Sequence, residues 1–257
     1  MQFKKTLIVL ASLALISPMS QAVAQDDEKT DGLANVVLIT AKDGQAKALE
    51  DAITAYHHYM ADKPGAWRWQ WYSITTGPDT GSYIARSGNH NYADFDVSHD
   101  WDDAAGAKFA SDVQPHIASA IATITRTDDE LGIWPESMEG YELISVTQWH
   151  VKQGKGQAFN EGLKKIDAIL KAGSWPSYYA FVYPVSGGKG NQVTLVSPRK
   201  NFADMAPKDP EFMDVMNEAM GEEETAAFFA EWSTTYYQGQ DSLLRYRAEL
   251  SDYGDSE

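Results

Sequence analysis

The chain repeats its own pattern at a constant offset of 110 residues, and this repeat constrains the fold more than any other feature. Lys42-Asp43-Gly44 recurs as Lys152-Gln153-Gly154, and Asn91-Tyr92-Ala93-Asp94 recurs as Asn201-Phe202-Ala203-Asp204. An apolar stripe at helical spacing also recurs, first as Leu49, Ile53, Tyr56 and Met60 and then as Phe159, Leu163, Ile166 and Leu170. A duplicated stretch of this size indicates two copies of one domain in the chain.

The first 24 residues have the pattern of a signal peptide. Lys4 and Lys5 form a basic head, the apolar run Leu7–Ile16 follows, and Ala22-Val23-Ala24 matches the small-x-small pattern of a cleavage site. We therefore expect cleavage near Ala24 and a periplasmic or secreted location. The alternative, an uncleaved membrane anchor, is disfavoured because a spanning helix needs about 20 apolar residues.

The net charge and the absence of cysteine disfavour several kinds of binding partner and one class of enzyme. The chain has 21 basic and 37 acidic side chains and a formal net charge of −16, which becomes −18 without the two lysines of the leader. Nucleic acid and anionic membranes bind basic surfaces, so neither is an expected partner. The chain has no cysteine, and it contains no G-x-S-x-G motif. A hydrolase with either nucleophile therefore has little support.

Hydrophobic periodicity and turn signals predict the same order of elements in both copies. In the first copy we expect strands over 36–39, 67–75, 83–86 and 123–127, and helices over 45–61, 102–110 and 113–122. In the second copy we expect strands over 143–151, 178–183 and 192–196, and helices over 156–171, 211–220 and 222–237. Near the end of each copy, Arg126 and Glu130-Leu131 match Arg245 and Glu249-Leu250 weakly, at an offset of 119.

The order strand, helix, strand, strand, helix, strand predicts an α+β chain of two ferredoxin-like, or split βαβ, units. The units are expected over residues 35–130 and 141–251. Residues 131–140 carry Gly and Pro and are predicted to be the linker. Residues 25–34 are polar and acidic and are predicted to be a disordered N-terminus.

These elements resemble the antibiotic biosynthesis monooxygenase-like group of the dimeric α/β-barrel superfamily. The residues that carry the resemblance are Lys42-Asp43-Gly44 and Lys152-Gln153-Gly154, each between a first strand and an amphipathic helix. The resemblance implies that two ferredoxin-like units close a barrel, here within one chain as a pseudo-dimer. A monomer is therefore expected, with a higher assembly as the alternative. It also implies that the haem-degrading branch uses an Asn in the first strand, a Trp and a helix His. The predicted interiors, 36–39 and 143–149, contain no Asn, and Asn35 is placed at an edge, which disfavours haem degradation.

Three residues are candidates for acid–base or anion-binding roles. His57 borders the apolar stripe of its helix, whereas His58 points away from it, so the two rings diverge and do not share a metal. His150 lies in the first strand of the second copy, and Arg86 lies at the end of a strand. We consider His57, His150 and Arg86 as catalytic candidates, although a structural role explains each of them as well. His90 and His99 are predicted to be loop residues, and His116 is a weaker candidate as a haem ligand. No metal site and no cofactor are predicted.

Aromatic residues give the main candidate for a binding site. Side chains alternate along a strand, so Trp67, Trp69 and Trp71 are expected to share one face of the second strand. Tyr179, Phe181 and Tyr183 occupy the equivalent places in the second copy. These six residues either pack in the core or line a pocket for a flat, apolar ligand. The repeated pair Asn91 and Asp94 is better explained as a capping box than as a catalytic pair.

The sequence therefore supports two classes of function and does not decide whether the protein is an enzyme. The first is an exported protein that binds a small apolar or aromatic molecule in an aromatic-lined pocket. The alternative is an oxygenase-like enzyme that needs neither metal nor flavin, with His57, His150 and Arg86 as proton acceptors or anion-orienting groups. A haem-binding or haem-degrading protein is a third and less supported alternative.

Overall fold

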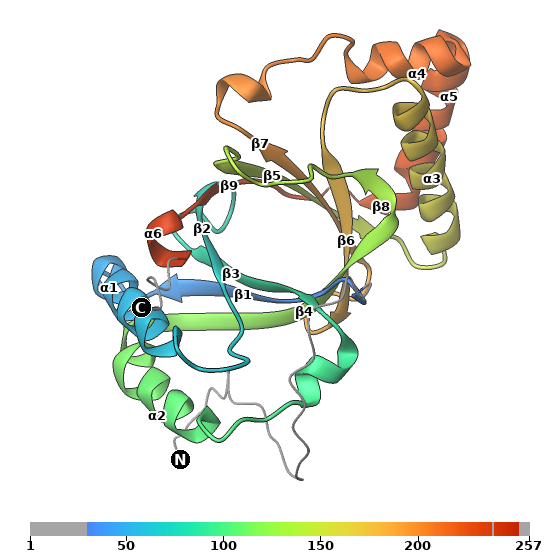
Figure 1. Ribbon diagram of the computed structural model, residues 1–257. Helices are drawn as coiled ribbons and strands as arrows, with labels where there is room; N and C mark the ends of the chain where they lie inside the picture. The colour runs from blue at the N-terminus through green and yellow to red at the C-terminus, as the bar shows by residue number, and fades with distance from the viewer. Residues whose placement is uncertain (1–29, 238, 252–257) are drawn as a thin grey trace, which may run out of the picture. The chain divides into compact units, whose positions relative to one another are not determined.

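The structure is a computed structural model, shown in Figure 1, and it describes residues 30–237 and 239–251. The predicted signal peptide and residues 25–29 lie outside the described residues. The chain forms two compact units. Unit 1 contains the described residues 30–72, 82–124 and 247–251, and unit 2 contains 73–81 and 125–246 apart from residue 238.

The two copies have the same order of elements. The first consists of β1 (Leu33–Ala41), α1 (Ala46–Met60), β2 (Gln70–Thr76), β3 (Tyr83–His90), α2 (Asp102–Asp112) and β4 (Ile117–Ile133). The second consists of β5 (Leu143–Val151), α3 (Gly156–Ala172), β6 (Tyr179–Ser186), β7 (Gln192–Arg199), α4 (Phe212–Met220), α5 (Glu222–Trp232), β8 (Tyr236–Tyr237) and β9 (Asp241–Tyr246). A short helix, α6 (Ala248–Ser251), follows. In Figure 1, helices α3, α4 and α5 lie together on one side of the strands of unit 2.

The two copies share the same pattern of strand pairing as well as the sequence repeat. The strands of the first copy follow the order β4-β1-β3-β2, and those of the second follow β9-β5-β7-β6. Val36 pairs with Arg86 in the first copy, and Val146 pairs with Val196 in the second, at the same offset of 110. The predicted α+β class with two ferredoxin-like units is thus confirmed.

The core of unit 1 lies between the sheet and helix α1. Val37, Ile39, Tyr83 and Ala85 project from β1 and β3 onto the apolar stripe of α1, together with Trp71 from β2. The stripe residues Leu49 and Ile53 are fully buried, as the helical spacing predicts. Because side chains alternate along each strand, the residues between these point to the opposite face of the sheet.

The core of unit 2 is built in the same way and is more aromatic. Phe159 and Leu163 of α3 are buried against Tyr179 and Phe181 of β6 and against Trp232 of α5. The rings of Phe159 and Trp232 stack at 5.3 Å, and Trp232 Nε1–H donates to the Phe159 carbonyl oxygen at 3.0 Å. Helices α4 and α5 therefore add a second layer of side chains over α3.

Each unit contains a leucine that the sequence repeat assigns to the other copy. Leu131, near the end of the first copy, is part of the core of unit 2. Its weak sequence match, Leu250 at the end of the second copy, is 1% exposed in the core of unit 1. The boundaries of the two compact units therefore differ from the predicted ones. One boundary follows Ile124 inside β4, and another follows Tyr246, the last residue of β9.

Several local predictions differ from the structure. Residues 131–133 of the predicted linker belong to β4, and residues 236–237 at the end of a predicted helix form β8. Residues 117–122 were predicted to end a helix but belong to β4, because pairing in a sheet overrides the helical propensity of their alanines. Trp67 and Trp69 precede β2, which begins at Gln70. Strand β1 begins at Leu33, so Leu33 and Ala34 are buried strand residues rather than part of a disordered N-terminus.

Candidate functional site

Three of the six aromatic residues predicted to bind a ligand are core residues instead. Trp71 is 5% exposed, Tyr179 is 2% exposed and Phe181 is 3% exposed, and all three face the helices of their units. The Tyr179 hydroxyl donates to Asp167 Oδ1 at 2.9 Å, and both burial and this hydrogen bond raise the pKa of Tyr179. Rings enclosed in this way present little surface to a ligand, and a ligand-binding role for these three residues stays a prediction from the sequence.

The other three predicted aromatic residues are half-buried. Trp67 stacks on the His90 ring at 4.0 Å, and the edge of Phe95 meets it at 5.0 Å. Trp69 packs against the core of unit 1, and Tyr183 packs against the core of unit 2. Burial raises the pKa of Tyr183 to about 12. These contacts are those of structural side chains at the margin of each core.

His57 is a buried neutral histidine in the core of unit 1. Its side chain is 3% exposed, and Trp71 Nε1–H donates to its Nε2 at 3.3 Å. Burial lowers the pKa of His57 to about 4, so the ring is uncharged at neutral pH. His58 is exposed, as predicted from the spacing of the helix. His57 is thus placed between helix and sheet and is not available as a proton acceptor for a bound substrate.

His150 lies in unit 2, on the face of the sheet that points away from α3. It pairs with Gln192 of β7 and Tyr237 of β8. Its Nδ1 is buried, and no hydrogen-bond partner for this atom is found within residues 30–237 and 239–251. The ring is therefore a polar group on a sheet face, and its Nδ1 is enclosed by the protein without a hydrogen-bond partner in the described residues.

Arg86 lies on the corresponding face of unit 1, opposite α1. It pairs with Val36 across β1 and β3, and the next pair on this face is Leu38 with Ile84. The guanidinium lies against the backbone of Gly88, since a Cβ at residue 88 would be 2.6 Å from the Arg86 Cζ. Gly88 thus leaves the space that the end of the Arg86 side chain occupies.

The Arg86 guanidinium belongs to a half-buried side chain and has no carboxylate partner in the described part of the chain. Burial lowers the pKa of Arg86, and the nearby Tyr72 hydroxyl acts weakly in the other direction. Among the described residues, no hydrogen bond or ion pair with the Arg86 guanidinium is found. Arg68 differs, because it is exposed and donates to the Ala61 carbonyl oxygen at 2.9 Å. Of the two arginines near this surface, only Arg86 is positioned to attract an anion onto an apolar sheet face.

A polar chain that the sequence analysis missed lies at the end of β3. His90 Nε2 is 2.8 Å from Ser87 Oγ, and His90 Nδ1 is 3.8 Å from Asp94 Oδ2. Ser87 is only 2% exposed, so a substrate has no access to its hydroxyl. The Asp94 carboxylate accepts from the Asn91 backbone N–H at 2.7 Å, which completes the predicted capping box. We interpret this chain as structural. The sequence predicts His90 to be a loop residue, and burial cannot be read from spacing in a loop.

The position of Asn35 differs from the predicted one. It was placed at the edge of the first strand, but it lies inside β1 and pairs with Ser87. Its Oδ1 is buried without a hydrogen-bond partner in the described part of the chain. An Asn therefore lies inside this strand, contrary to the prediction from the sequence.

The contacts of three histidines also bear on haem binding. His57, the helix histidine that faces inward, is enclosed against Trp71, and His58 is exposed to solvent. The Nδ1 of His116 is hydrogen bonded with Gln45 Oε1 at 2.8 Å. Residues 30–237 and 239–251 also contain no group of three or more His, Cys, Asp or Glu side chains with the geometry to hold a metal ion. In the same residues, no helix is both long and apolar enough to cross a bilayer.

Comparisons with known proteins support the fold. No known family profile and no curated protein sequence matches the chain. A candidate monooxygenase from Lactobacillus acidophilus NCFM has a solved structure with a TM-score of 0.50 and 7% identity, over 84% of this chain and 94% of that one. A candidate monooxygenase from Fusobacterium nucleatum subsp. nucleatum has a TM-score of 0.50 and 10% identity, over 84% of this chain and 93% of that one. The chain thus has the fold of the dimeric α/β-barrel superfamily, as the resemblance implied.

Proposed function

We propose that the protein binds a small, largely apolar molecule that carries an anionic group, on the face of the unit 1 sheet opposite α1. The observation that carries this proposal is the unpaired guanidinium of the half-buried Arg86 beside the apolar side chains of Val36, Leu38 and Ile84. The ligand's apolar body would cover these side chains, and its anion would meet the guanidinium.

The physical argument is the cost of leaving a cation desolvated and unpaired. A buried charge costs several kcal/mol unless a counter-charge and hydrogen bonds compensate it. A planar guanidinium presents paired N–H donors that fit a carboxylate or a similar oxyanion. The formal charge of −16 gives the chain many carboxylates, yet none in its described part pairs with Arg86. This isolation is typical of a site that receives its anion from a ligand.

Two fluorescent probes of similar size test the proposal. Anilinonaphthalene sulfonate carries an anion on an aromatic body, and N-phenylnaphthylamine is its neutral counterpart. We expect the protein to bind both. In the Arg86→Met variant, which keeps the apolar stem, sulfonate binding should weaken by about 1.5–3 kcal/mol, or roughly 10- to 150-fold. Binding of the neutral probe should change less than about twofold. Equal losses for both probes, or no sulfonate binding by the unaltered protein, would refute the proposal.

The oxygenase alternative has less support from the geometry. It requires a proton acceptor beside the anchored substrate, and His57 was one candidate for this role. His57 lies between α1 and the sheet, whereas Arg86 lies on the other face of the same sheet. These two candidate residues are therefore not brought together. The description of the structural neighbours as candidate monooxygenases remains a statement about those proteins.

A further inference from the structure

We infer that the two copies have diverged so that only unit 1 anchors an anion, and that the chain binds one anionic ligand rather than two. This inference rests on the proposed function and concerns its stoichiometry and its location. A duplicated domain would by default give two equivalent sites. The strand registers allow a direct comparison of the two faces, position by position.

The two positions that make the anion anchor in unit 1 are replaced in unit 2. At the offset of 110, Arg86 corresponds to Val196 and Gly88 corresponds to Pro198. The structure confirms that these positions are equivalent, because Val196 pairs with Val146 as Arg86 pairs with Val36. Unit 2 thus has a short apolar side chain where unit 1 has its cation.

The exchange of Gly88 for Pro198 reinforces the difference. In unit 1 the bare backbone at Gly88 accommodates the end of the Arg86 side chain. Pro198 is instead a fully buried side chain, and its ring occupies the corresponding position. An arginine at residue 196 alone would therefore lack the space that Gly88 provides to Arg86.

The next pair of side chains on this face is apolar in unit 1 and polar in unit 2. Leu38 and Ile84 in unit 1 correspond to Gln148 and Thr194 in unit 2, which also pair directly. Unit 1 combines an apolar surface with one charge, whereas unit 2 combines an uncharged polar pair with an apolar end. The chemistry that would hold an aromatic anion is present in the first copy and absent from these positions of the second.

The test is the number of sulfonate probes bound per chain, measured by isothermal titration calorimetry and checked by native mass spectrometry. We expect one anilinonaphthalene sulfonate per chain in the unaltered protein, and loss of that site in Arg86→Met. A stoichiometry of two in the unaltered protein, with one site of unchanged affinity left in Arg86→Met, would overturn the inference and leave the proposed function standing. No sulfonate binding at all, or a single site whose affinity Arg86→Met leaves unchanged, would instead refute the proposed function.

The second measurement introduces the arginine and glycine of unit 1 at the equivalent positions of unit 2. The double variant Val196→Arg/Pro198→Gly should bind two probes per chain, and the matched control Pro198→Gly should still bind one. If the folded double variant also binds one, positions 196 and 198 do not account for the difference between the copies. If the double variant does not fold, as judged by circular dichroism, the comparison of the unaltered protein with Arg86→Met decides alone.

Discussion

At the scale of single residues, His57 and Arg86, the two candidate residues of unit 1, differ in whether they carry a charge at neutral pH. His57 is kept neutral by burial in the core, whereas Arg86 is kept charged without a partner on the opposite sheet face. The sequence identified both residues but could not assign them to a face. Helical spacing showed that His57 borders the apolar stripe, yet the contact with Trp71 depends on the packing of α1 on β2.

The low pKa of His57 predicts a pH dependence of stability. Its pKa is about 4 in the folded protein and about 6.5 in an unfolded chain. The unfolded state therefore binds the proton more tightly, and stability falls as the pH decreases from about 6.5 to 4. The full difference amounts to about 3 kcal/mol. Urea unfolding at several pH values should show this slope, and His57→Gln should reduce it. The reduced pKa of His90 adds a slope of the same sign in both proteins. An unchanged slope in His57→Gln would contradict the burial of this ring.

Gly88 offers a second test at residue scale. We expect Gly88→Ala to displace the Arg86 guanidinium and to weaken binding of the sulfonate probe about tenfold. The displaced group is the end of a flexible side chain, so the free energy of unfolding should fall by less than about 1 kcal/mol. Gly106→Ala in α2 is the matched control, because nothing lies within 4 Å of its new Cβ. Equal sulfonate affinity in the two variants would show that Gly88 does not position Arg86.

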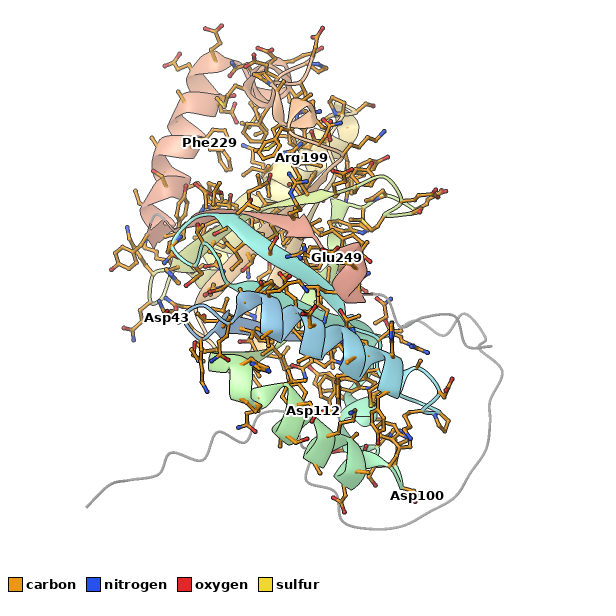
Figure 2. All side chains as sticks on the ribbon, turned by 90° about the vertical axis from the view of Figure 1, so that its left-hand side faces the viewer. Asp43, Asp100, Asp112, Arg199, Phe229 and Glu249 are labelled. Carbon is orange, nitrogen blue, oxygen red and sulfur yellow. The ribbon has the colours of Figure 1, made fainter. Side chains whose placement is uncertain are left out.

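At the scale of elements, a charged cluster attaches the C-terminal helix α6 to α1. Glu50 Oε1 accepts from the Tyr83 hydroxyl at 2.7 Å and from Arg247 NH1 at 2.9 Å, and Arg247 Nε donates to Glu249 at 2.6 Å. Figure 2 shows Glu249 on α6, next to α1. Burial and the hydrogen bond to Glu50 raise the pKa of Tyr83 to about 12. Burial would raise the pKa of Glu50, but the hydrogen bonds from Arg247 and Tyr83 lower it overall. Leu250, on the same short helix, packs in the core of unit 1.

We expect Arg247→Ala to destabilise the protein by about 1–2 kcal/mol, because it removes charge-assisted hydrogen bonds and leaves the half-buried Glu50 carboxylate without its arginine partner. Lys47→Ala is the control. Lys47 forms an ion pair with Asp51 on the exposed side of the same helix, so its loss should cost less than about 0.5 kcal/mol. Denaturant titration of both variants measures the difference. Similar values for the two variants would mean that the cluster does not stabilise the attachment of α6.

The elements that could be predicted from the sequence are those with strong periodicity. Strand 143–151 was predicted with the observed bounds, and α1 and α3 were predicted to within a few residues. Residues 117–122 were predicted as helix because alanine favours helices, and only pairing with β1 explains their strand conformation. The aromatic residues were ambiguous for a similar reason, since alternation shows that side chains share a face but not whether helices cover that face.

At the scale of the whole molecule, duplication explains the fold, and divergence explains the site. The matches at an offset of 110 correspond to equivalent strand pairs in the two copies. The weak match at an offset of 119 is also meaningful, because Leu131 and Leu250 each complete the core of a unit formed mainly by the other copy. Neither copy therefore contains all the residues of one core. The location and the signal peptide remain predictions from the sequence.

This exchange predicts that a single copy does not fold by itself. Residues 25–140 lack Arg247 and Leu250, and loss of a buried leucine alone costs about 2–5 kcal/mol. We expect this fragment to show no cooperative thermal transition, and we expect one to return when it is co-expressed with residues 141–257. A fragment that unfolds cooperatively by itself, as a monomer, would contradict the exchange of core residues.

The most direct test of the central claim is a crystal structure of the protein with anilinonaphthalene sulfonate. The sulfonate oxygens should lie within hydrogen-bonding distance of the Arg86 guanidinium, with the rings against Val36, Leu38 and Ile84. A probe bound only elsewhere, with the Arg86 guanidinium paired to a carboxylate of the chain itself, would contradict the assignment of this face as the binding site.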